Sequence, residues 1–294
     1  LPTVHGEKVV LRLLGSGGKK LTLTNLGFPE KKLQTFRKWI NQPYGMVIIS
    51  GPTGSGKSTT LYASLMEIQN EGINVTTVED PVEYQIPGIN QVQMHDAIGL
   101  NFSSSLRSIL RQDPDVLLIG EIRDEETADI AVKFSLTGHL VFSTVHANDA
   151  ASTIARLLDL GIPPFLLGSS LNLIMAQRLV RTIDEETKEE YQPQEDELKR
   201  IAIEKNELNK MKFYKGKPTS ENHNTGYKGR TAIHEILEIN SDMRQLIYNN
   251  SSQLEIRDLA IKNGMTSLRD AGIEKIKDGT STIEEILRAT VEDN

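Results

Sequence analysis

The chain has 294 residues, of which 38% are hydrophobic and 25% are charged, a balance typical of a globular protein with room for more than one domain. A net charge of −7 gives no support for a nucleic-acid-binding surface, and the absence of cysteine excludes disulfides and thiolate metal sites and is compatible with a reducing cytoplasm. No apolar run approaches the roughly 20 residues of a transmembrane helix, and no signal peptide is visible.

Residues 1 to about 28 are predicted to be β-rich. Val9–Leu14 reads as a strand, and a glycine-rich segment, 15–18, separates it from a second short strand at Lys20–Leu23. Because the first strand lacks partners and the chain begins with Leu1 rather than Met, we expect the sequence to be a piece of a longer protein.

From about residue 29 to residue 180, helices and strands alternate. An amphipathic helix comes first, with Leu33, Phe36 and Ile40 on one side. The elements expected after it are strand 46–50, helix 59–69, strand 73–78, helix 102–111, strand 116–119, helix 125–136, strand 140–145 and helix 150–158. This order predicts an α/β domain whose parallel sheet is covered on both faces.

A glycine-rich motif follows the first predicted core strand. It consists of Gly51, Pro52, Thr53, Gly54, Ser55, Gly56, Lys57 and Ser58, and we include Thr59 at the start of the next helix. The glycines let successive N–H groups point at one anion, and the helix N-terminus adds partial positive charge. Lys57 would reach the β- and γ-phosphates, and the Ser58 hydroxyl would hold Mg²⁺. A loop that only turned the chain would not need this Lys-Ser pair, so the sequence predicts a RecA-like P-loop core that binds ATP or GTP.

Two later strands are followed by carboxylates. The segment 79–83 supplies three of them after strand 73–78, and Glu121 follows strand 116–119 in a Walker B-like element with Glu in place of Asp. In an open parallel sheet these strand ends meet at the edge where ligands bind. A glutamate there is suited to orient the attacking water or to bond the water shell of Mg²⁺.

The strand 140–145 has a histidine at each end. His139 precedes the strand and His146 follows it, about 20 Å apart at the usual rise of a strand, so they cannot form one metal pair. Either histidine could be purely structural. His146 is the stronger candidate for function, because it lies at the ligand-binding edge.

Four ordered motifs closely resemble those of the type II/IV secretion ATPases, hexameric motors of type II secretion and type IV pili. They are the glycine-rich motif, Glu-Asp-Pro-Val-Glu at 79–83, Leu-Arg-Ser-Ile-Leu-Arg-Gln-Asp-Pro-Asp at 106–115 with Gly-Glu-Ile-Arg-Asp at 120–124, and Gly-His-Leu-Val-Phe-Ser-Thr-Val-His at 138–146. The resemblance covers nearly the whole chain. It implies an ATP hydrolase that uses ATP and Mg²⁺ and works as a homo-oligomeric ring.

The resemblance also implies roles for single residues. Glu83 would be a catalytic glutamate in the family's Asp box, and Glu121 would be the Walker B glutamate, acting on the metal through water. His139 and His146 would belong to a His box that senses or contacts the γ-phosphate. Lys57 would complete the catalytic set.

The resemblance makes residues 1–28 the end of a PAS-like N-terminal α+β domain. In the family an arginine of that domain reaches a neighbouring nucleotide, and Arg12 is the candidate here, although it could equally be a solvated strand arginine. Arg107, Arg111 and Arg123 are further candidates for neutralising the charge on the phosphates.

In the extension and secretion branch of the family, two Cys-x-x-Cys pairs bind zinc in an insertion that retraction ATPases lack. The four ligand positions fall here at Asp184, Thr187, Thr219 and Asn222. None of the four is a thiolate, so we predict an insertion at 181–226 without structural zinc. The retained insertion favours the extension and secretion branch.

The remaining residues, 227–294, contain apolar residues at helical spacing from 232–237 onward and predict a small C-terminal helical subdomain. The predicted division is therefore 1–28, 29–180, 181–226 and 227–294.

By resemblance, the protein is a cytoplasmic ATPase at the inner face of the cell membrane. It would be peripheral to the membrane, act on an inner-membrane platform protein and make no direct contact with nucleic acid. Two alternatives are open: a nucleotide-gated assembly module with little turnover, and a competence or DNA-transport relative of the same motors.

Overall fold

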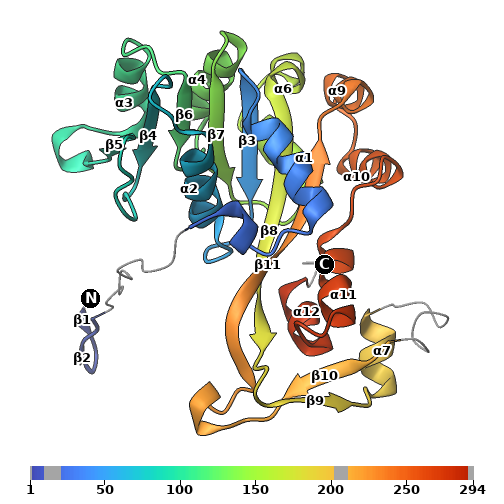
Figure 1. Ribbon diagram of the computed structural model, residues 1–294. Helices are drawn as coiled ribbons and strands as arrows, with labels where there is room; N and C mark the ends of the chain where they lie inside the picture. Colours follow the sequence, from blue (N-terminus) through green and yellow to red (C-terminus); the bar gives the residue numbers. More distant parts are fainter. Residues whose placement is uncertain (1, 10–20, 202–210, 291–294) are drawn as a thin grey trace.

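The computed structural model describes residues 2–9, 21–201 and 211–290 (Figure 1). Arg12 and most of the strand predicted at Val9–Leu14 lie outside the described residues. Near the N-terminus, β1 (Pro2–Thr3) pairs antiparallel with β2 (Gly6–Glu7). A turn of 3-10 helix, Leu23–Asn25, replaces the end of the second short strand that the sequence suggested.

A seven-stranded sheet forms the centre of the molecule, in the order β11-β8-β3-β7-β6-β4-β5. Its strands are β3 (Gly45–Ser50), β4 (Val75–Glu79), β5 (Asn90–Gln93), β6 (Val116–Ile119), β7 (Leu140–Val145), β8 (Leu171–Ile183) and β11 (Tyr227–Glu238). Neighbouring strands are parallel, except that β11 runs antiparallel to β8 at one edge. The predicted α/β class with a parallel sheet is confirmed.

Helices cover both faces of this sheet. Along β3, Val47 packs in the core beneath α1 (Glu30–Ile40) and α2 (Lys57–Ile68), whereas Ile48 belongs to the core on the opposite face. That opposite face is covered by α3 (Phe102–Ile109), α4 (Glu125–Leu136), α5 (Ala150–Asp159) and α6 (Pro164–Ser170). Burial on both sides explains why the central strands read as continuous apolar runs. None of the helices in the described ranges is both long and apolar enough to cross a bilayer.

The C-terminal part packs around the far ends of β8 and β11, where a third apolar core includes Val180 and Ile233. Its helices are α7 (Glu195–Ile201), α11 (Leu268–Lys277) and α12 (Ile283–Ala289), whereas α9 (Ser241–Tyr248) and α10 (Gln253–Lys262) pack with α6 and α5 in the core that contains Ile48. A two-stranded antiparallel sheet, β9 (Lys188–Tyr191) with β10 (Phe213–Gly216), lies in the insertion.

One predicted element is wrong. Residues 232–237 were expected to be helical, but they form the second half of strand β11 in the main sheet. All six are buried, because β11 has α1 and its core on one side and α11 on the other, so no period-two alternation is visible in the sequence. The division into four domains stays a prediction, although β8 crosses its boundary at residue 180.

A buried carboxylate ties the C-terminal helices to the core. Glu235 on β11 accepts hydrogen bonds from the backbone N–H of Ala150 (2.8 Å) and of Leu268 (3.1 Å), the first residues of α5 and α11. Burial raises the pKa of Glu235, while the two N–H groups stabilise its charged form. The loop before α5 is therefore fixed to α11 through one side chain.

The four insertion positions singled out in the sequence do lie together. The Asn222 amide donates to the Asp184 carboxylate (3.1 Å), the Thr187 hydroxyl (3.3 Å) and the Lys217 carbonyl (2.8 Å). Thr219 caps the short 3-10 turn that contains Asn222. We call this group the Asn222 cluster. Its hydrogen bonds join the end of β8 to the loop before β11.

Candidate nucleotide-binding site

The glycine-rich motif forms a loop between the end of β3 and the start of α2. Gly56 has φ +88°, and a Cβ at this position would lie 2.8 Å from the Gln177 Nε2 atom. A Cβ on Gly51 would lie 2.5 Å from the Gln177 carbonyl oxygen. Only glycine therefore lets the loop curl against β8 and present its N–H groups at the tip of α2.

Lys57 is folded over the loop that contains it. Its Nζ donates to the carbonyl oxygens of Gly51 (2.8 Å) and Pro52 (3.0 Å). Burial lowers the pKa of Lys57, the nearby Glu121 carboxylate opposes this shift, and Arg178 adds to it. Phosphate oxygens could take the place of these two carbonyl oxygens as partners of Lys57. Ser58 and Thr59 are exposed beside it in the first turn of α2.

The tips of β7, β6 and β4 follow β3 across the sheet, so they lie about 5, 10 and 14 Å from it at the usual strand spacing. The Thr144 hydroxyl on β7 donates to the Gly120 carbonyl (2.7 Å), and the Ile122 N–H donates to the Thr144 carbonyl (3.0 Å). The Gly120 N–H in turn donates to the carbonyl of Val78 on β4 (2.8 Å). These bonds fix the three tips relative to one another.

Glu121 lies at the β6 tip with its side chain 15% exposed. One oxygen pairs with the Arg123 guanidinium, and the other lies 3.6 Å from His146 Nε2. Lys57 is close enough for Glu121 to affect its pKa. The structure therefore brings four predicted residues together: Lys57, Glu121, Arg123 and His146.

The segment 79–83 reaches this site through a tyrosine of α2. Buried Glu79 accepts hydrogen bonds from the hydroxyls of Tyr62 and Thr77, so it has a structural role. The Tyr62 hydroxyl also accepts a bond from the Glu83 N–H (3.1 Å). Half-buried Glu83 is thereby linked to the helix that starts at the phosphate loop.

Other predicted residues lie elsewhere. His139 is at the opposite end of β7, stacked on Phe134 at 4.0 Å, with Nδ1 3.2 Å from the Phe134 carbonyl oxygen. Arg107 pairs with Glu126 on the exposed side of α3 and α4, and Arg111 donates to the Arg107 carbonyl. The structure does not bring these three residues to the phosphate loop.

The sequence analysis missed Gln177 as a residue of this site. Gln177 on β8 is 2% exposed; its Nε2 donates to the Ser55 carbonyl (2.7 Å) and its Oε1 accepts from the Thr60 hydroxyl (2.8 Å). Gln177 therefore fixes the phosphate loop and the start of α2 to β8. The signal was a polar pair, Gln177-Arg178, inside a long apolar run. Arg178 donates to the Asn148 carbonyl (3.1 Å) in the loop after His146.

Oxygen-rich chemistry at this edge fits a magnesium nucleotide. An open cleft of about 610 Å³ lies beside the loop, between Pro52 and the segment from His146 to α5. The Ser58 hydroxyl and the Glu121 carboxylate supply the oxygen donors that Mg²⁺ prefers. The loop N–H groups and Lys57 supply positive charge for phosphates.

Comparison with known proteins agrees with this chemistry. The profile of a family described as "Type II/IV secretion system protein" matches residues 1–288. The type IV pilus assembly ATPase PilB of Myxococcus xanthus is 47% identical over 99% of this chain and 52% of its own length. The type II secretion system ATPase E of Vibrio cholerae is 44% identical over 99% of this chain and 58% of its own. The chain thus spans about half the length of these relatives.

A solved structure, the pilus retraction motor PilT with bound ADP, superposes with a TM-score of 0.70. It is 27% identical, and the match covers 94% of this chain and 69% of PilT. The Legionella pneumophila ATPase DotB, 22% identical with a TM-score of 0.66 over 90% of this chain and 64% of its own, shares the fold.

Proposed function

Because this chain belongs to the type II/IV secretion system protein family, we propose that it binds ATP with Mg²⁺ at the phosphate loop and hydrolyses it to power assembly of a type IV pilus or a type II secretion pseudopilus. The observation that carries the proposal is the convergence of Lys57, Glu121 and His146 at adjacent strand tips beside the loop. The PilT structure, whose title names bound ADP, supports the nucleotide.

The residues would divide the work as follows. Lys57 would exchange the carbonyls of Gly51 and Pro52 for phosphate oxygens, which also compensate its buried charge. Glu121, held between Arg123 and His146, would orient the attacking water. Bound Mg²⁺, held by Ser58 and through water by Glu121, would neutralise phosphate charge. Glu83 would add a second carboxylate.

We further propose that the protein works as a homo-oligomeric ring, a hexamer, at the cytoplasmic face of the inner membrane. The relatives named as pilus assembly and type II secretion ATPases support this, as does the retained insertion. The ring would act on a platform protein of the membrane and make no direct contact with nucleic acid. The Asn222 cluster would take the place of a structural zinc.

Two substitutions test this function. Lys57→Ala should abolish binding of a fluorescent ATP analogue and phosphate release, whereas Lys199→Ala, at an exposed lysine of α7, should leave both unchanged. Glu121→Gln should retain binding but lose hydrolysis. Undiminished phosphate release in Lys57→Ala would refute the site.

A further inference from the structure

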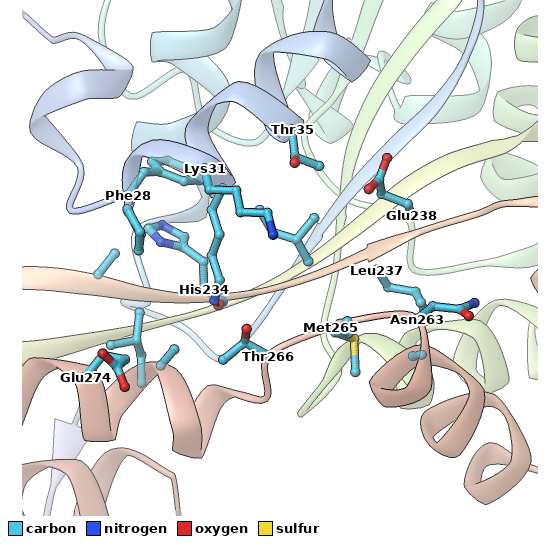
Figure 2. Close-up of a pocket in the computed structure, with 18 of the residues that line it drawn as sticks. Phe28, Lys31, Thr35, His234, Leu237, Glu238, Asn263, Met265, Thr266 and Glu274 are labelled. Atoms are coloured by element: carbon cyan, nitrogen blue, oxygen red, sulfur yellow. The ribbon is translucent and has the colours of Figure 1, made fainter.

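A second cavity, of about 1240 Å³, lies along strand β11 and away from the phosphate loop (Figure 2). We call it the β11 groove. Figure 2 shows Phe28, Lys31 and Thr35 on the side of α1, and Thr266 and Glu274 on the side of α11. The strand between them lines the groove from Ala232 to Glu238, about 20 Å at the usual rise. The groove is therefore long and narrow rather than compact.

The strand that lines this groove is the edge strand of the sheet, and residues 27–32 cover part of its outer backbone. The Lys32 Nζ donates to the His234 carbonyl (2.5 Å), so this carbonyl points away from β8. The Ala232 amide nitrogen and carbonyl oxygen also face outward, toward Gly27. Along a strand, the backbone N–H and C=O groups of successive residues point to opposite edges. Those of Ile236 therefore face the same side as those of Ala232 and His234. Within the described ranges no loop or side chain bonds to either group.

The groove is electropositive, in contrast to the chain as a whole. Six lysine or arginine and three acidic side chains line it, although the net charge of the chain is −7. Each acid already has a lysine partner: Glu238 with Lys38 (3.2 Å), Glu274 with Lys277 (3.0 Å) and Asp278 with Lys275 (3.8 Å). Lys31, Lys32 and Arg244 are left with no acidic partner among the lining residues.

Buried polar atoms in the groove lack partners as well. His234 is 1% exposed and stacks on Phe28 at 3.8 Å, and neither of its ring nitrogens bonds to a described residue. The Arg244 Nε atom is also buried and has no hydrogen-bond partner among the described residues. Buried polar atoms are normally paired, so these atoms lack a partner that the described residues do not supply.

We propose that the β11 groove binds an extended, acidic segment of a partner protein, which adds as a further strand to the edge of β11. The outward backbone groups would supply register and affinity, as in other strand additions. Lys31, Lys32 and Arg244 would face the carboxylates, and Phe28 and Met265 would contact apolar side chains. A compact anion would use only a fraction of this length.

Fluorescence polarisation with labelled heptapeptides tests the mode of binding. The 294-residue chain should bind a peptide of alternating Glu and Val. An analogue with alternate backbone nitrogens methylated keeps the charge but cannot pair, and it should bind at least about tenfold more weakly. The Lys-Val analogue should be weakened to a similar degree. Equal binding of either analogue would overturn strand addition to an electropositive edge.

A charge reversal and its control locate the site. Lys31→Glu should weaken binding of the Glu-Val peptide about threefold to tenfold, whereas Lys133→Glu, the same change at an exposed lysine of α4, should have no effect. Deuterium exchange offers a readout independent of variants: the Ile236 amide should become protected when the peptide is added. An unprotected Ile236 amide overturns the proposal. So does a chain that sediments as a dimer through this edge and excludes the peptide.

Discussion

The phosphate-loop edge and the β11 groove lie at two edges of one sheet, and they differ in how they are built. At the first, each chemical group comes from a short segment that directly follows a strand: Lys57 after β3, Glu121 after β6, His146 after β7. At the second, the lining comes from segments around residues 27–39, 232–244 and 260–278, each of which looks ordinary alone.

The difference shows which kinds of site are visible in a sequence. Parallel strands place their C-terminal ends at one edge, so local motifs there converge whatever the rest of the chain does. No comparable rule predicts where a groove forms between a sheet edge and helices that are far apart in the chain. The two regions are nevertheless connected, because His234 on β11 pairs with Gln177 on β8, which supports the phosphate loop.

The largest effect is expected at the phosphate-loop edge. Glu121→Gln keeps the size of the side chain but removes the carboxylate that would orient water, so kcat should fall about 10²–10⁴-fold. The free energy of unfolding should hardly change, because Glu121 is partly exposed. Steady-state phosphate release and thermal unfolding measure the two quantities. A large drop in stability would make Glu121 a structural residue, like Glu79.

In the β11 groove the expected effect is on stability and depends on pH. Burial lowers the pKa of His234 to about 3, against an ordinary value of 6.5, so the folded protein keeps this ring neutral. The contribution of neutral His234 to the free energy of unfolding is complete above pH 6.5. It is lost as the pH falls toward 3, because the histidine of the unfolded chain then binds a proton that the buried ring does not. At pH 4.5 the loss is about 2–3 kcal/mol.

His234→Phe should remove this acid-dependent loss of stability. Urea titrations of the wild-type protein and of His234→Phe at pH 7 and pH 4.5 measure the loss. His5→Phe, at an exposed histidine, is the control. If the wild-type protein and His234→Phe lose stability equally on acidification, His234 is already protonated in the folded state.

Gln177 connects the two regions, and its substitution should affect both activity and stability. Gln177→Ala leaves the Ser55 carbonyl without its donor, which should destabilise the fold by about 1–3 kcal/mol and raise KM for ATP more than it lowers kcat. Asn172→Ala is a matched control on the same strand: this buried amide donates to the Tyr44 carbonyl (2.7 Å), far from the loop. It should cost stability with KM unchanged. Equal KM values in both variants would contradict a role in positioning the loop.

The smallest effect is expected from Tyr62→Phe. The hydroxyl links Glu79 and the Glu83 N–H to α2, so its loss should cost about 1 kcal/mol of stability and reduce kcat a few-fold by loosening Glu83. Tyr84→Phe, on the ring that packs edge-on against Tyr62, serves as the control for activity. An unchanged kcat in Tyr62→Phe would separate Glu83 from this link.

The fold was predictable where local pattern and tertiary burial agree. The strands 116–119 and 140–145 and the helix 125–136 have the predicted limits. Strand β11 was not predictable, because Ile233, Ile236 and Leu237 have helical spacing around the buried polar pair His234-Glu235. His139 shows the same limit for sites: it belongs to a motif, yet the structure stacks it on Phe134 at the opposite end of β7.

The sequence by itself determined the phosphate loop, the strands that end next to Glu121 and His146, and the family, because each depends on residues close together in the chain. Tertiary structure alone decided that Gln177 supports the loop from β8, that Tyr62 links Glu83 to α2, and that the outer edge of β11 faces an electropositive groove. Those contacts join segments more than 20 residues apart. These contacts form only where particular surfaces pack together, and the spacing of residues within one segment does not determine which surfaces those are.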